Sequence, residues 1–240
     1  MKKYIVYIKS LFLLSVVVFL YGFSAERNAS RIVENSVVEF SNGANLFLSH
    51  EMVNKLLIQK NGEVKNQPKS LINLHDLENA VFQNPLVEDV KIYLTIDGLL
   101  KTMIKQRTPI ARVNSGKEVY YIDEQGVKMP LSSNYSARVL LVSGEVHEED
   151  LQPIYSLVTK LNSDSFLSKL IVGIQKKSTG DYILQTRKYD QKVFIGKIEN
   201  LNLKFKKLEA FYNEMIQRNE VATYKTINLK FSNQVVCTKN

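Results

Sequence analysis

The chain has 240 residues, a formal net charge of +8, three histidines, one cysteine and no tryptophan. This length suits one or two domains, and a hydrophobic fraction of 45% is enough to build a buried core. A single cysteine excludes an intrachain disulfide framework and a cysteine-rich zinc site. Whether the positive charge indicates nucleic acid depends on where the charged residues lie and which compartment they face.

The N-terminus contains a long apolar segment. Residues 5–23 include one charged side chain, Lys9, and as a helix they would span roughly 28 Å, about one hydrocarbon core. Lys2 and Lys3 precede this segment, so the positive-inside rule predicts a cytoplasmic stub at 1–4 and an exported remainder. We therefore expect a transmembrane helix. A cleaved signal peptide is the alternative, because small residues near the end of the segment could serve as a cleavage site.

Residues 30–108 are expected to form a small module with the element order β-α-α-β-β. Helix N-caps are predicted at Ser49 and Asn73, and Asp97-Gly98 predicts a two-residue hairpin turn in which both positions take positive φ. The expected elements are a strand at 32–40, helices at 49–59 and 73–83, and two hairpin strands, 90–96 and one after Gly98. Two helices would then cover one face of a small sheet.

Residues 109–240 are expected to form an antiparallel sheet with helices on one side. Asn200 is predicted to cap the longer helix. The predicted helices lie at 148–161 and 200–218, and the predicted strands lie at 110–113, 118–122, 127–129, 139–142, 169–176, 181–187, 192–196, 224–231 and 234–238. The fold class expected for the whole chain is therefore α+β.

No group of residues in the sequence has the spacing of a catalytic, cofactor-binding or metal site. His50, His75 and His147 are far apart and each lies near a predicted helix start, which favours surface or capping roles over metal ligation. Cys237 is expected to be a packed thiol and Asp123 a hairpin-turn residue. Glycine-rich phosphate loops and nucleophile motifs are absent from the sequence. We expect no cofactor, no small-molecule substrate and no enzymatic activity.

Most of the net charge lies between residues 176 and 207. Three acidic residues oppose nine basic ones in this stretch: Lys176, Lys177, Arg187, Lys188, Lys192, Lys197, Lys204, Lys206 and Lys207. One interpretation is a solvated polar face. The other is a basic surface that steers an acidic partner segment. Nucleic acid is not expected as a partner, because this part of the chain faces away from the cytoplasm.

Several local patterns are shared with one protein family. They are LHDLENAVFQNPLVEDVKIYL, DGLLKTMIKQRTPIARV, YYIDEQGVKMPLS, RVLLVSGEV and INLKFSNQVVCTK. Together these segments resemble the bacterial cell-division family FtsQ, also called DivIB, and are most similar to its Bacteroidetes branch. The short cytoplasmic stub departs from family members that have a long one.

The resemblance implies a single-pass inner-membrane protein of the division septum, with its N-terminus in the cytoplasm and its domains in the periplasm. Residues 30–108 would be a POTRA-like domain that contacts other divisome proteins. Residues 109–240 would be an FtsQ-type β domain that binds FtsB and FtsL, a pair of small bitopic coiled-coil proteins. Such a protein would link early and late division proteins without catalysing a reaction.

The resemblance also places the partner-binding site in the last strands. The physical basis would be β-augmentation, in which an exposed edge strand offers its unpaired N–H and C=O groups to a partner segment. The expected edge runs from Tyr224 to Phe231, with Ile227 and Leu229 in the core and Lys230 available to a partner carboxylate. The predicted partner-binding residues are Tyr224, Thr226, Asn228, Lys230, Phe231, Val235 and Val236.

Two other classes of protein stay open on the sequence. POTRA-like modules also occur in export and outer-membrane assembly proteins, so an accessory protein of that kind is the main alternative. The chain has one such module and no room for a β-barrel. An exported enzyme is the other class, and the lack of a catalytic motif argues against it.

Overall fold

The computed structural model describes residues 2–41, 46–61 and 64–239. The chain divides into two compact units, Met1–Gln106 and Arg107–Asn240. Helix α1 (Lys2–Ala29) opens the chain and continues past the predicted segment 5–23. Its stretch Tyr7–Ala29 is long and apolar enough to cross a membrane. A signal sequence has the same length and composition, so this helix fits both N-terminal interpretations.

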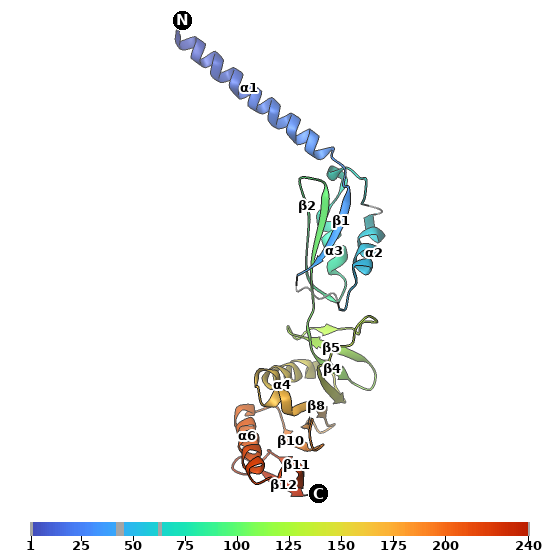
Figure 1. The fold of residues 1–240 in the computed structure, drawn as a ribbon, viewed down its shortest axis with the longest axis vertical. Coiled ribbons are helices and arrows are strands. Elements are labelled where there is room, and N and C mark those ends of the chain that lie inside the picture. Colours follow the sequence, from blue (N-terminus) through green and yellow to red (C-terminus); the bar gives the residue numbers. More distant parts are fainter. Residues whose placement is uncertain (1, 42–45, 62–63, 240) are drawn as a thin grey trace. The chain divides into compact units, whose positions relative to one another are not determined.

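After α1, the first unit contains a three-stranded sheet and two α-helices, as predicted (Figure 1). The strand order is β1-β3-β2, in which the central strand β3 pairs parallel with β1 and antiparallel with β2. Helices α2 and α3 bury their apolar stripes, which include Val53, Leu57, Leu77 and Val81. The elements are β1 (Asn35–Phe40), α2 (His50–Asn61), the 3-10 helix η1 (Lys69–Leu71), α3 (Leu74–Phe82), β2 (Val87–Leu94) and β3 (Leu99–Gln106).

Local chemistry explains how these elements begin and turn. The Asn73 side chain accepts the backbone N–H of Asp76 at 3.3 Å, and it caps α3 as predicted. The hairpin turn differs from the prediction. Gly98 has φ 90 and donates its N–H to the carbonyl of Thr95 at 3.2 Å, whereas Asp97 is not in a positive-φ conformation. The loop is therefore one turn over residues 95–98, in which only the glycine is left-handed.

The second unit contains a nine-stranded sheet in the order β12-β11-β10-β9-β8-β7-β4-β5-β6. The α+β class is confirmed, but the expectation of an antiparallel sheet is wrong. The pairs β4–β7, β7–β8 and β10–β11 are parallel. Helix α4 (Leu151–Ser163) lies in the crossover from β7 to β8 and helix α6 (Leu201–Gln217) in the crossover from β10 to β11, whereas strands β5 and β6 lie in the connection from β4 to β7. The strands are β4 (Pro109–Asn114), β5 (Val119–Asp123), β6 (Lys128–Met129), β7 (Leu140–Gly144), β8 (Ile171–Lys176), β9 (Tyr182–Thr186), β10 (Lys192–Gly196), β11 (Tyr224–Asn228) and β12 (Val236–Lys239).

The helices of the second unit share one hydrophobic core with the inner residues of the sheet. These helices are α4 (Leu151–Ser163), α5 (Leu167–Leu170) and α6 (Leu201–Gln217), with 3-10 turns η2 (Glu148–Asp150) and η3 (Val221–Thr223). Ile154, Leu157 and Leu161 of α4 and Leu208 of α6 are fully buried in this core. The Asn200 prediction is wrong in its detail: this residue is left-handed, with φ 53, and its side chain makes no capping hydrogen bond.

Asp123 occupies the predicted turn, but its carboxylate has a second role. One oxygen accepts the backbone N–H groups of Gln125 and Val127, at 3.0 Å and 2.7 Å. The other lies 2.7 Å from the guanidinium of Arg107, and the Asp123 side chain is fully buried. The sequence alone does not pair these two residues. The ion pair fixes the start of the second unit to the β5–β6 turn.

Candidate partner-binding edge

Strand β12 forms one edge of the large sheet, and β11 lies inside it. β11 pairs with β10 on one side and with β12 on the other. The predicted edge from Tyr224 to Phe231 is therefore wrong, because most of that segment already has strand neighbours on both sides. The free backbone groups for strand addition belong to β12. Chain order alone cannot say which strand ends a sheet, since a crossover can insert any strand between two others.

The predicted partner-binding residues divide between two strands and the segment that joins them. Tyr224, Thr226 and Asn228 lie on β11, Val236 lies on β12, and Lys230, Phe231 and Val235 lie between the strands. Phe231 and Val236 are 47% and 39% exposed, the two large apolar side chains of this region most open to solvent. Tyr224 is half-buried and packs edge-on against Phe211, with ring centroids 5.5 Å apart. The fold thus brings Val236 to the edge and keeps Tyr224 partly in the core.

Ile227 and Leu229 are both fully buried, so the prediction that they belong to the core is confirmed. The N–H of Leu229 donates to the carbonyl of Phe194 at 2.9 Å and extends the pairing beyond the end of β11. On the opposite face, the hydroxyls of Thr226 and Thr238 are hydrogen bonded across β11 and β12. Burial of these two apolar residues fixes which face of β11 is turned to solvent.

Lys230 already has a carboxylate partner in its own chain. Its ammonium lies 2.9 Å from Asp181, whose pKa is lowered by this hydrogen bond. The stem of Lys230 lies over Gly196, where a Cβ would come within 3.1 Å of its Cγ. The sequence pattern did not indicate this pair, because Asp181 belongs to a turn 49 residues earlier. A partner carboxylate at Lys230 would therefore compete with Asp181.

Several basic residues of 176–207 are engaged within the fold. Lys176 is paired with Asp150, and the ammonium of Lys197 donates to the carbonyl of Thr179 at 3.0 Å. Lys204 is 8% exposed, and its ammonium donates to the carbonyl of Lys197 at 2.8 Å. Burial lowers the pKa of Lys204. Lys177, Lys192 and Lys206 are exposed. Some basic residues of 176–207 therefore stabilise the fold through contacts within the chain, and others form a solvated surface.

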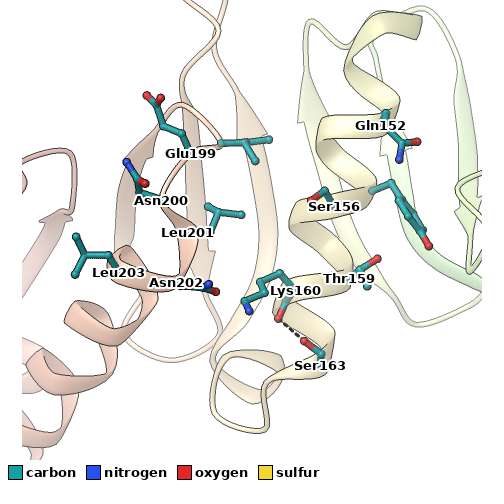
Figure 2. Close-up of a pocket in the computed structure, with 12 residues that line it drawn as sticks. Gln152, Ser156, Thr159, Lys160, Ser163, Glu199, Asn200, Leu201, Asn202 and Leu203 are labelled. Atoms are coloured by element: carbon teal, nitrogen blue, oxygen red, sulfur yellow. Dashed lines mark hydrogen bonds between the residues drawn. The ribbon is translucent and has the colours of Figure 1, made fainter.

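A groove that the sequence did not indicate runs between α4 and the start of α6 (Figure 2). Its volume is about 740 Å³. Hydroxyl and amide side chains contribute most of its polar lining: Gln152, Ser156, Thr159, Ser163, Asn200 and Asn202. No histidine or cysteine lines this groove, and the only charged residues in its lining are Lys160 and Glu199.

Within the described ranges, no cluster of three or more His, Cys, Asp or Glu residues has the geometry to hold a metal ion. His50 begins α2, His75 lies in the first turn of α3 and His147 precedes η2. Cys237 is half-buried on β12, and burial raises the pKa of its thiol. The three histidines are exposed, which fits the surface or capping role expected for them, and the half-buried Cys237 fits the packed thiol that was expected.

Taken together, the fold is that of an α+β protein with an apolar N-terminal helix, a small POTRA-like module and a larger mixed-sheet module. Residues 37–105 match the family described as a POTRA-like domain. Residues 108–238, more than half of the chain, match the family described as FtsQ/DivIB, C-terminal related. The chain belongs to the FtsQ/DivIB family.

Two sequence relatives are consistent with this membership. The chain is 23% identical over 205 residues to the cell division protein DivIB of Clostridium tetani, covering 79% of this chain and 76% of that protein. It is 26% identical over 70 residues to DivIB of Clostridium acetobutylicum, covering 29% and 28%. The solved extracytoplasmic domain of DivIB from Geobacillus stearothermophilus is 13% identical, with a TM-score of 0.30, covering 38% of this chain and 79% of that domain.

Proposed function

We propose that this protein is a bitopic, non-enzymatic member of the divisome that joins division proteins through contacts outside the cytoplasm. The observation that carries the proposal is membership of the FtsQ/DivIB family over residues 108–238. Residues 1–4 would be cytoplasmic, α1 would anchor the chain in the inner membrane, and the domains at 30–108 and 109–240 would lie in the periplasm at the septum. The length and apolar character of Tyr7–Ala29 support the anchor.

The proposed partners are FtsB- and FtsL-like bitopic coiled-coil proteins, bound at the end of the large sheet. An extended partner segment would pair with β12, which has a strand neighbour on one side only. The exposed side chains of Val236 and Phe231 would contact the partner. Thr226, Asn228 and Lys230 would lie on the adjoining surface. The half-buried side chains of Tyr224 and Val235 would pack beneath this surface and support it. The POTRA-like unit would contact other divisome proteins.

Co-purification from membranes tests this proposal. The full chain, solubilised in detergent, is expected to retain the FtsB- and FtsL-like pair. Val236→Asp should weaken retention at least tenfold, because a charge at the edge strand disfavours an apolar contact. Leu203→Asp is the matched control, since Leu203 is 51% exposed and lies on α6. Equal retention of the partner pair by both variants would contradict the proposal that the partner binds at β12.

Depletion of the protein in cells tests the role in division more broadly. Cells that lack it are expected to grow into filaments without septa, because the late division proteins would no longer be joined to the early ones. Normal septation after depletion would contradict the proposal. Co-purification of barrel-assembly proteins in place of coiled-coil partners would favour an outer-membrane assembly role.

A further inference from the structure

Strand β12 is a short edge strand whose contacts are made with β11, including a hydrogen bond between the hydroxyls of Thr226 and Thr238. It has four residues and pairs with β11 alone. Cys237 is its only residue that is not exposed. Val235, just before the strand, and Cys237 are the apolar side chains that pack partly against the core at this point. Besides its pairing with β11, the connecting segment 229–235 is therefore what holds β12 in place.

The first end of segment 229–235 is fixed by burial and pairing. Leu229 is fully buried, and its N–H donates to the carbonyl of Phe194 at 2.9 Å. Lys230 follows, with its ammonium 2.9 Å from Asp181. Beyond Lys230 the side chains up to Gln234 are exposed. The contacts of this part must therefore come from its backbone.

Three carbonyl oxygens of this segment converge on one ammonium group. The Nζ of Lys207, from helix α6, donates to the carbonyl of Phe231 at 2.6 Å. The carbonyls of Leu229 and Ser232 lie at 3.4 Å from the same nitrogen. An ammonium has three N–H donors and no acceptor, so three carbonyls match its full capacity. Among the described residues, Lys207 has no carboxylate within 4.0 Å.

We propose that Lys207 is a positioning residue for the partner-binding edge, because it fixes segment 229–235 and thereby the place of β12. This inference rests on the proposed function, in which a partner strand adds to β12. Lys207 does not contact the partner: its donors are directed at the backbone of its own chain. Its positive charge strengthens these three hydrogen bonds and offsets the repulsion between the carbonyl oxygens that converge in one place. A pre-ordered edge strand binds a partner with a smaller loss of conformational entropy.

Lys206 provides the matched control. It precedes Lys207 on the same helix and is exposed, whereas Lys207 is half-buried. Lys207→Met removes the donors and keeps the apolar stem, and Lys206→Met removes the same charge from the neighbouring position. Lys207→Arg keeps a cation with donors at the site. Circular dichroism and thermal unfolding of each full-length variant in detergent show whether it is folded.

Amide hydrogen exchange of the full chain tests the positioning role without a partner. In Lys207→Met, exchange of residues 231–239 should be roughly tenfold faster, the change expected when a hydrogen bond to a charged group is lost. Exchange in α4 and β8 should stay unchanged. Lys206→Met should match the wild type, and Lys207→Arg should fall between. The proposal would be overturned if residues 231–239 exchange at the wild-type rate in Lys207→Met, or if their exchange rises equally in Lys206→Met.

Retention of the FtsB- and FtsL-like pair completes the experiment. Lys207→Met should weaken retention in parallel with the faster exchange, and Lys206→Met should not. Faster exchange with unchanged retention would show that Lys207 does not position the binding edge for the partner, which would overturn the proposal. If the wild-type chain itself fails to retain the pair, the proposed function is wrong, and the exchange data then decide separately whether Lys207 orders β12.

Discussion

Strand β2 of the small sheet and strand β12 of the large sheet each have a strand neighbour on one side only. β2 has eight residues and buries three of them, and the backbone N–H of Ile92 on this edge donates to the carboxylate of Glu78 at 2.7 Å. β12 has four residues and buries none. No side chain in the described part of the chain hydrogen bonds to the backbone of β12. One edge is therefore partly closed by its own helix α3, and the other is left open to pairing.

The difference shows that one sheet edge in a chain can be blocked by its own side chains while another stays available for strand addition. A carboxylate that accepts an edge N–H occupies the position that an added strand would need. At β12 the stabilising contacts are the pairing with β11, the hydroxyl bond between Thr226 and Thr238, the packing of Cys237 and the segment that leads into the strand. We therefore expect the two edges to respond differently to mutation.

The largest effect is expected in the interior of the large sheet. Asp123→Ala leaves Arg107 without its partner in a buried site, which typically costs about 3–5 kcal/mol of unfolding free energy. The loss should fall on residues 107–240 and spare the small sheet and its closed edge. Denaturant unfolding, followed by hydrogen exchange in peptides from each unit, measures this.

Glu118→Ala is the control for this substitution. Glu118 is paired with Lys128 on the surface, with both side chains at least 40% exposed. Exposed pairs of this kind contribute less than about 1 kcal/mol. If Asp123→Ala and Glu118→Ala cost the same, the buried pair does not stabilise the large unit.

A pH-dependent effect is expected at the pair of Asp150 and Lys176, whose side chains are 13% and 11% exposed. Burial alone would raise the pKa of Asp150, but the hydrogen bonds from Lys176 and from the N–H of His147 outweigh it and lower this pKa below 3.8. A carboxylate with a lowered folded pKa stabilises the fold above its unfolded pKa, and this contribution disappears as the pH falls through the folded pKa.

Asp150→Asn should therefore destabilise the large unit by about 3 kcal/mol near neutral pH, as expected for a broken buried pair. The difference from the wild type should shrink as the pH is lowered below the unfolded pKa of about 4. Unfolding curves of both proteins across this range provide the measurement. A difference that stays constant with pH would show that the charge of Asp150 is not responsible.

The closed edge of the small sheet should open when its acceptor is removed. Glu78→Ala leaves the N–H of Ile92 without a partner in a partly buried position, a loss of about 1–3 kcal/mol. Glu78→Gln keeps a carbonyl oxygen as acceptor and should lose less. Hydrogen exchange at Ile92 and sedimentation velocity test this: the alanine variant should exchange faster and self-associate more. Equal exchange rates and equal self-association in Glu78→Ala and Glu78→Gln would show that the Glu78 acceptor does not close the β2 edge.

The smallest stability effect is expected at the pair of Lys230 and Asp181, because the two side chains are 48% and 28% exposed. Its loss should cost less than about 1 kcal/mol. Lys230→Glu is nevertheless expected to weaken partner binding, either by losing a contact or by repelling Asp181. The double variant Lys230→Glu with Asp181→Lys separates the two causes. Restored binding would assign the effect to the intrachain pair, and continued loss would assign it to the partner.

The sequence predicted the parts of the fold that depend on local patterns. Alternation of apolar residues located the strands, and Asn73 marked the start of α3 because its side chain accepts the first free N–H groups of that helix. Burial of Ile227 and Leu229 followed from the same alternation. These features depend on neighbours a few residues apart. They do not require knowledge of which segments meet across the sheet.

Only the tertiary structure decided the arrangement of the large sheet. Two helical crossovers set parallel pairs among its strands and placed β10 beside β11, which left β12 at the edge in place of the predicted segment. The contacts of Asp123 with Arg107, Lys230 with Asp181 and Lys207 with segment 229–235 follow from that arrangement. Local periodicity fixes which face of a strand is buried, but long-range packing chooses its neighbours, because any strand with a suitable apolar face can pair with another.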